Sequence, residues 1–147
     1  MELAHIISSW LGDAKLMQLA TASNNQPWVC TVGFVSDDNF NIFWFSRNSR
    51  RHSREIMKNG QVAATIVNDI AGRQAIQLTG VAAKLPLEQA PEIHAMYKAK
   101  LGIEPVSLAD LGKSTEVSFW RLTPTLISTW DEVNFADNPK REYGLPE

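Results

Sequence analysis

An apolar run of this chain ends in the segment Phe45-Ser46-Arg47-Asn48-Ser49-Arg50-Arg51-His52-Ser53-Arg54-Glu55-Ile56, which opens a predicted short helix over about 49–58. Together with Lys58, the segment holds five of the chain's 14 Lys and Arg residues. Cations in the first turn of a helix oppose the macrodipole, at a cost of about 0.3–1 kcal/mol each. The free N–H groups at that end favour anions instead. The cluster therefore predicts a bound anion, with phosphate as the first candidate.

Hydrophobic periodicity around this segment predicts the rest of the fold. Strands are expected over 17–22, 28–35, 40–45, 61–67, 74–85, 115–122 and 126–130. The strand over 74–85 is expected to bulge or bend at Gly80, and Pro124 separates the last two. Helices are expected over 3–12 and 87–101, with Gly102 as a stop and Asn59-Gly60 as a left-handed stop for the central helix. Short strands with few helices between them predict a mainly β protein, a small antiparallel barrel with peripheral helices.

Length and composition predict one ordinary globular domain. The chain has 147 residues, of which 44% are hydrophobic and 20% charged. We expect the domain over 1–133, followed by a polar, turn-rich tail over 134–147 with little fixed order. The net charge of −2 provides no global basic field for nucleic acid.

Cys30 is the one cysteine, so no internal disulfide can form, and we expect a cytoplasmic protein. No apolar run approaches the length of a membrane span, so no membrane partner is expected. The three histidines are not spaced with other ligands in the manner of a metal site, and none is predicted.

The basic segment also has an ordinary interpretation, a solvated helix face. Few acidic residues lie nearby, which favours phosphate binding by Arg51 and His52, because Arg offers a planar fork and His a second donor. Ser46 or Ser49 would either contact the phosphate or cap the helix. The remaining cations are expected mainly to face solvent: Arg47, Arg50, Arg54 and Lys58.

The run 19–67 resembles the FMN-binding split-barrel family whose namesake is pyridoxamine 5'-phosphate oxidase. The resemblance rests on a strand that ends Ala20-Thr21-Ala22, on Gln26-Pro27, on an Asp-Asp hairpin, and on Phe45-Ser46 followed by the basic doublet Arg51-His52. Later motifs are Gln77-Leu78-Thr79-Gly80 and Arg121-Leu122-x-Pro124. The motifs up to residue 85 cover about half of the chain, whereas the second half matches only loosely.

The resemblance implies a six- or seven-stranded antiparallel split β-barrel that forms a homodimer, with FMN at the subunit interface. It implies that Phe45 and Ser46 lie beside the flavin and that Arg51 and His52 hold its phosphate. Other implied contacts are the backbone of Thr31, Val32 and Gly33 along the ring system, and Arg121. From the residues themselves, Gln77 or, less favourably, Gln74 could bond the ring edge, while the alternative is a strand face that is only solvated. No residue stands out as a catalytic acid or base.

Two positions depart from the oxidase. His52 stands where the oxidase has a lysine, and Val35 stands near the place of its second-strand lysine. The residues that hold the pyridoxal phosphate substrate have no visible counterpart, so another small-molecule redox substrate is expected. An FMN-dependent oxidoreductase is thus the first interpretation. The alternatives are a flavin carrier or sensor, a barrel that has lost FMN or holds haem or deazaflavin, and, last, a nucleic-acid-binding protein.

Overall fold

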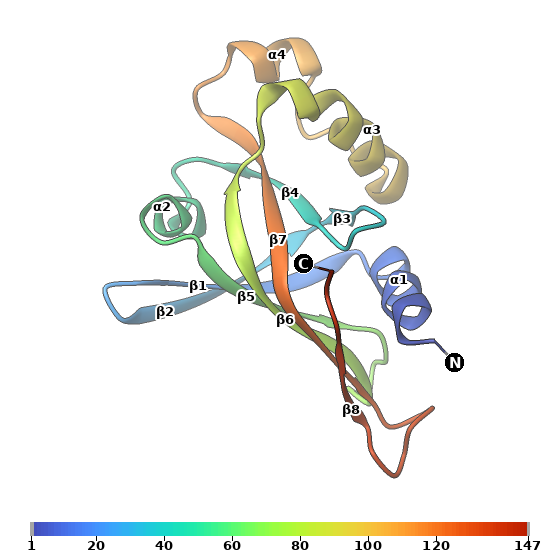
Figure 1. Cartoon of the computed structure of the whole chain (residues 1–147). Helices are drawn as coiled ribbons and strands as arrows, with labels where there is room; N and C mark the ends of the chain where they lie inside the picture. Colours follow the sequence, from blue (N-terminus) through green and yellow to red (C-terminus); the bar gives the residue numbers. More distant parts are fainter. Residues whose placement is uncertain (1, 147) are drawn as a thin grey trace.

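The computed structural model describes residues 2–146, which form one curved antiparallel sheet with helices at its periphery (Figure 1). Eight strands occur in these residues, in the order β2-β1-β5-β6-β7-β4-β3, and β8 pairs with β7. The predicted mainly β, split-barrel class is confirmed, although the sheet has more strands than the six or seven expected. No helix in the described part of the chain has the length and apolarity to cross a bilayer.

The strands are β1 (Leu16–Ser23), β2 (Gln26–Gly33), β3 (Val35–Ser36), β4 (Ile42–Arg47), β5 (Gln61–Val67), β6 (Gln74–Lys84), β7 (Val117–Asp131) and β8 (Lys140–Tyr143). The helices are α1 (Leu3–Asp13), α2 (Arg51–Lys58), α3 (Ala90–Leu101) and α4 (Leu108–Lys113). A short 3-10 turn, Leu87–Gln89, precedes α3.

The two strands predicted around Pro124 are one continuous strand, β7. The ladder with β6 shifts register between Thr79 and Gly80, where Thr79 pairs with Leu126 and Gly80 with Pro124. Thr125 is therefore the extra residue of a bulge. Proline has no N–H to donate and is tolerated at such a bulge. The predicted irregularity at Gly80 is confirmed, but Pro124 does not end the strand as expected.

Other boundaries differ for local reasons. The strand predicted over 28–35 breaks at Phe34, so that β2 and β3 are separate. β4 begins later than expected, because Phe40 has a φ of 64° and cannot continue an extended strand. Gly102 ends α3 with a φ of 71°, as predicted, whereas the left-handed stop at Asn59 is wrong. Asn59 has an extended φ of −145°, and its Nδ2 donates to the carbonyl of Ala22 at 3.1 Å.

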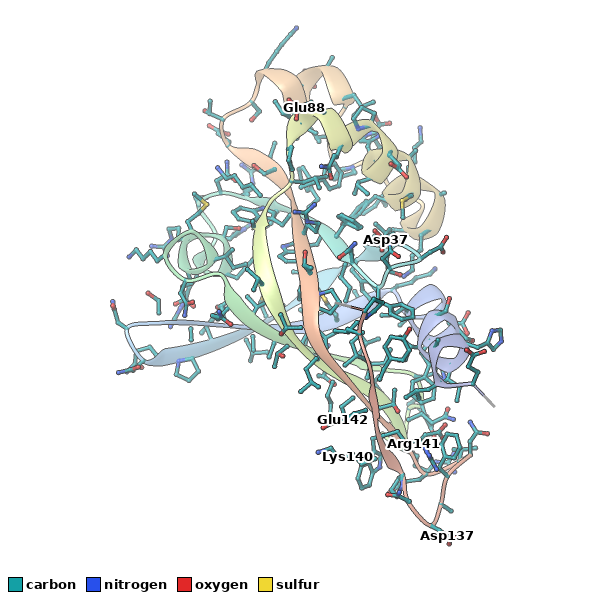
Figure 2. All side chains as sticks on the ribbon, in the orientation of Figure 1. Asp37, Glu88, Asp137, Lys140, Arg141 and Glu142 are labelled. Carbon is teal, nitrogen blue, oxygen red and sulfur yellow. The ribbon has the colours of Figure 1, made fainter. Side chains whose placement is uncertain are left out.

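The predicted loose order of the C-terminal tail is wrong for residues 140–143. These residues form β8, which pairs with β7 from Ile127 to Trp130. Tyr143 packs edge-to-face on Phe40, with ring centroids 5.4 Å apart. Figure 2 shows Asp137 at the tip of the preceding loop and Lys140, Arg141 and Glu142 along the strand.

The core lies on the inner face of the curved sheet. Trp44 and Trp120 pair across β4 and β7 and are fully buried there. α1 and α2 pack on this core through Trp10, Leu11 and Ile56. A second apolar cluster lies under α3 and α4. The outer face of the central strands keeps many exposed apolar side chains, and the candidate site is built around α2 and this face.

Candidate functional site

Two of the predicted phosphate ligands, Ser46 and His52, meet at the end of β4 beside α2. Ser46 Oγ lies 2.8 Å from His52 Nε2, and each residue is only 8% exposed. Burial lowers the pKa of His52, and the charge of Arg50 lowers it further, so the imidazole is neutral at neutral pH. The alternative cap role of Ser46 or Ser49 is wrong, since Arg50 is the N-cap residue and no side chain caps the helix.

Arg51 points away from this pair. Its guanidinium carbon lies 4.2 Å from the centroid of the Trp28 ring, and its Nε donates to Glu55 at 3.1 Å. Successive helix residues are rotated by about 100°, which explains why Arg51 and His52 lie on different sides of α2. Arg51 and His52 are adjacent in sequence, but their side chains have different neighbours: Trp28 and Glu55 for Arg51, and Ser46 for His52.

Glu55 was missed by the sequence reasoning, which assumed few acidic neighbours. Its carboxylate accepts a hydrogen bond from Thr21 Oγ1 at 2.7 Å as well as from Arg51. The bond from Thr21, and then the bond and charge of Arg51, hold the pKa of Glu55 below its usual value. The i,i+4 spacing of Arg51 and Glu55 was the available sequence signal. No local pattern indicated the contacts with Thr21 and Trp28.

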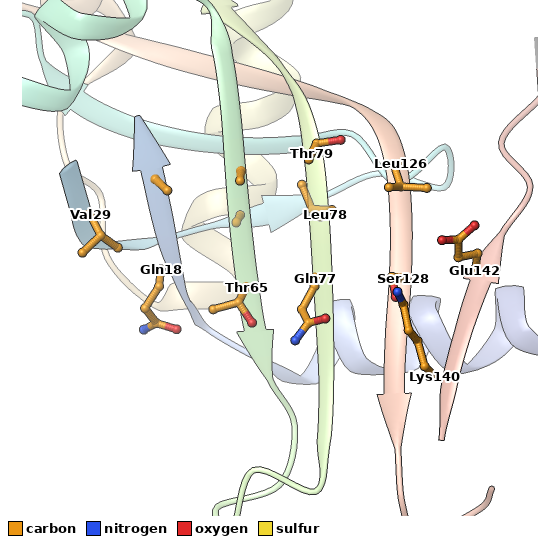
Figure 3. A pocket seen from close by; sticks show the side chains of 13 residues that line it. Gln18, Val29, Thr65, Gln77, Leu78, Thr79, Leu126, Ser128, Lys140 and Glu142 are labelled. Carbon is orange, nitrogen blue, oxygen red and sulfur yellow. The ribbon is translucent and has the colours of Figure 1, made fainter. Parts of the chain in front are cut away.

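A groove of about 460 Å³ runs across the outer face of the sheet. Four polar residues from successive strands stand in one register at its floor: Gln18, Thr65, Gln77 and Ser128. A second row, formed by Val29, Ala20, Ala63, Thr79 and Leu126, borders them. Figure 3 shows the polar row with Val29 and Leu126 beside it. The groove therefore has a polar strip along an apolar wall.

Of the residues that line this groove, only Gln77 is a site residue predicted from the sequence. Ser128 Oγ is buried and has no hydrogen-bond partner among the described residues, and Lys140 and Glu142 of β8 also line the groove. A sequence signal for Ser128 was available: strand side chains alternate between faces, so Ser128 lies on the same face as Leu126 and Trp130. The contribution of β8 to the groove lining was not predicted, because residues 134–147 were expected to have little fixed order.

The strand residues predicted to flank the flavin ring do not share one face. Thr31 is exposed, Val32 packs against the main core, and a Cβ added to Gly33 would lie 3.2 Å from Leu101. Thr31 is in register with Gln18, and thus in the same row as Gln77. Three strand spacings, or about 14 Å, separate Thr31 from Gln77.

Phe45 and Arg121, two further predicted flavin contacts, do not line this groove. The Phe45 ring packs edge-to-face on Phe119, 5.4 Å between centroids, in the cluster under α3. Arg121 is half-buried on β7 opposite Phe43, whereas Ser46 pairs with Ser118 on that strand. Three residues along a strand span about 10 Å. The single chain thus does not bring Arg121 together with Ser46 and His52.

The donors around the start of α2 fit a phosphate group. A serine hydroxyl, an imidazole and a guanidinium come from one short segment, and the first N–H groups of a helix have no partner within the helix. Ser46 and His52 bond each other at present, so a phosphate would use their remaining hydrogen-bonding capacity. Among the described residues, the one carboxylate bonded to this set is Glu55, 12% exposed, and its charge is offset by Arg51 at 3.1 Å.

Comparison with known proteins gives a family match. The model of the family described as "Pyridoxamine 5'-phosphate oxidase" matches residues 4–131. Among curated proteins, none matches the sequence significantly.

Solved structures share the fold at low sequence identity. HutZ, a haem storage protein from Vibrio cholerae, is 22% identical with a TM-score of 0.69, over 84% of this chain and 91% of its own. An FAD-binding protein from Mesorhizobium loti is 16% identical with a TM-score of 0.68, over 87% and 92%. A protein of unknown function from Agrobacterium tumefaciens is 17% identical with a TM-score of 0.71, over 86% of this chain but only 55% of that protein.

Proposed function

This chain belongs to the pyridoxamine 5'-phosphate oxidase family, and on that premise we propose that it binds FMN and works as a flavin-dependent oxidoreductase on a small molecule. The observation that carries the proposal is the Ser46–His52 pair beside the first turn of α2, with Arg51 adjacent to His52 in sequence. When bound, the flavin supplies the redox chemistry, and the protein binds and orients it. A relative that binds FAD supports flavin as the class of cofactor.

In this proposal Ser46 and His52 hold the phosphate. Arg51, whose side chain is 42% exposed, turns away from Trp28 and Glu55 and adds its guanidinium. The backbone of residues 31–33 flanks the ring system. Phe45, Gln77 and Arg121 are the further proposed flavin contacts. Because the single chain keeps these three apart, a complete site requires residues from a second copy.

The outer face of the sheet is the proposed interface with that second copy. Five large apolar side chains on it are 42–59% exposed: Leu16, Val29, Val67, Val81 and Leu126. The polar row of Gln18, Thr65, Gln77 and Ser128 runs between them, and monomeric proteins rarely leave so much apolar surface on one face in water. The face is continuous with the groove that holds Gln77, so its burial would enclose the polar row between two sheets.

Replacing Leu126 with glutamate should convert the proposed dimer to monomers, because the charge would be buried in an apolar interface. The native protein should scatter light with about twice the 16.4 kDa mass of one chain. The dissociation constant of the dimer should rise by at least about tenfold in the variant. Ile103→Glu is the matched control, since Ile103 is also exposed but follows α3. A monomeric mass for the native protein at micromolar concentration would contradict the interface.

A visible absorbance spectrum and an FMN titration test the cofactor. We expect saturable FMN binding and at least about tenfold weaker binding of riboflavin, which lacks the phosphate. Turnover with NADH or NADPH would then support an oxidoreductase, whereas tight binding without turnover would favour the carrier or sensor. A colourless protein that does not respond to FMN would contradict the proposal.

Haem is the second candidate because of the fold shared with a haem storage protein. The buried histidines offer it little support. His52 bonds Ser46, and His94 Nε2 lies 2.8 Å from the carbonyl oxygen of Val106. Iron coordination through Nε2 of either residue would displace that partner, whereas His5 is exposed. A parallel haem titration, read from the Soret band, separates this candidate from flavin.

A further inference from the structure

A polar cleft of about 250 Å³ lies between the β1–β2 turn and α2. Its lining consists of Ser23, Asn24 and Gln26 on one side and Arg51, Arg54, Glu55 and Lys58 on the other. The turn is tight, because Asn24 and Asn25 both adopt left-handed conformations, with φ of 53° and 61°. The β1–β2 hairpin projects beside α2 in Figure 1, and five residues of the cleft lining are exposed: Asn24, Gln26, Arg51, Arg54 and Lys58.

The cleft carries an unbalanced positive charge. Arg51, Arg54 and Lys58 are spaced i, i+3 and i+7, which places them along one side of the helix. Glu55 is the one carboxylate in the lining, and it already bonds Thr21 and Arg51. Like charges at these spacings destabilise a helix unless a counter-charge lies between them. The amides and hydroxyl on the turn add neutral donors opposite the cations.

This cleft is separate from the proposed flavin phosphate site. Ser46 and His52 are buried on the other side of α2, and neither lines the cleft. Arg51 connects the cleft with the proposed flavin phosphate site, because it lines the cleft and is followed in the chain by His52. A ligand with two adjacent phosphates could therefore occupy both sides of Arg51.

We propose that the cleft binds a phosphate group of an adenine nucleotide, beside the flavin phosphate at Ser46 and His52. The position of that flavin phosphate rests on the proposed function. Trp28 offers a ring for the base: it is 41% exposed, and its face becomes free when the guanidinium of Arg51, 4.2 Å from the ring centroid, turns to the phosphate. The nucleotide could be the adenylate half of FAD or part of a reduced nicotinamide dinucleotide, which share this chemistry.

Equilibrium dialysis with ADP tests the cleft directly, without flavin. We expect the native protein to bind ADP and the double variant Arg54→Gln/Lys58→Gln to bind it about tenfold more weakly. Arg73→Gln/Lys98→Gln removes the same charges at exposed positions outside the cleft, and its affinity should stay within about twofold of the native value. Circular dichroism would show whether α2 is retained in each variant.

The same variants distinguish the source of the nucleotide. A loss of FAD affinity with unchanged FMN affinity would support FAD, and a raised KM for NADPH alone would support the electron donor. Equal losses for FMN and FAD would overturn the inference, because the cleft would then hold the flavin's own phosphate. No ADP binding by the native protein, or equal losses in both double variants, would also overturn it. Failure of the flavin proposal is seen separately, in the FMN titration.

Discussion

Replacing Gly80 with alanine should lower the free energy of unfolding by about 2–4 kcal/mol, the cost expected for forcing atoms into a packed sheet. A Cβ at this position would lie 2.5 Å from the carbonyl oxygen of Thr123 and 2.6 Å from Leu122 Cδ2. The Thr123 oxygen is backbone, and Thr123 pairs with Val81 two residues from the bulge at Thr125, so it cannot move without disturbing the ladder. Urea denaturation measures the effect.

Gly112→Ala is the control for this substitution. Gly112 lies in α4, and no heavy atom would come within 4 Å of an added Cβ. The change should be neutral or should stabilise the protein by about 0.5–1 kcal/mol, since alanine is the better helix former. If both variants unfolded at the same urea concentration, the tight contact at the bulge would not matter to stability.

Replacing His52 with alanine should weaken FMN binding at least tenfold, or by about 1.5–3 kcal/mol, because a hydrogen bond to a charged phosphate is lost. Riboflavin affinity should change little, since riboflavin has no phosphate for His52 to hold. Fluorescence titration of both ligands measures the difference. Equal weakening for both would indicate a folding defect, and unchanged FMN affinity would remove His52 from the site.

The role of His52 also predicts a pH dependence. Burial and Arg50 lower the pKa of the free residue, whereas a bound phosphate favours the charged imidazolium and raises it. FMN binding should therefore take up a proton, and affinity should rise as the pH falls from about 8 to 6. The His52→Lys variant replaces the imidazole with an amine whose ordinary pKa lies well above this range. It should retain affinity and lose the part of the pH dependence that His52 supplies.

Local patterns predicted most elements because local forces form them. The alternation of β-branched and polar residues in 61–67 and 74–85 became β5 and β6, and Gly102 ends α3 as its freedom at positive φ allows. The failures had tertiary causes. Pro124 breaks an isolated strand, but it is accommodated in β7 by the bulge opposite Gly80. Residues 140–143 have a polar pattern and become β8 only because the edge of β7 is free to pair.

The candidate site was predicted less completely than the fold. Ser46 and His52 were selected from a motif, and they lie in contact. Arg51 was joined to His52 by adjacency in sequence, yet its side chain is held by Trp28 and Glu55 instead. The sequence by itself determined the mainly β class, the tight turns, the irregularity at Gly80 and the helix end at Gly102, since neighbouring residues decide backbone conformation. Only the tertiary structure decided the polar row of Gln18, Thr65, Gln77 and Ser128 and the cleft beside α2. Those groupings depend on strand order and register, which bring together residues far apart in the chain and which no local pattern specifies.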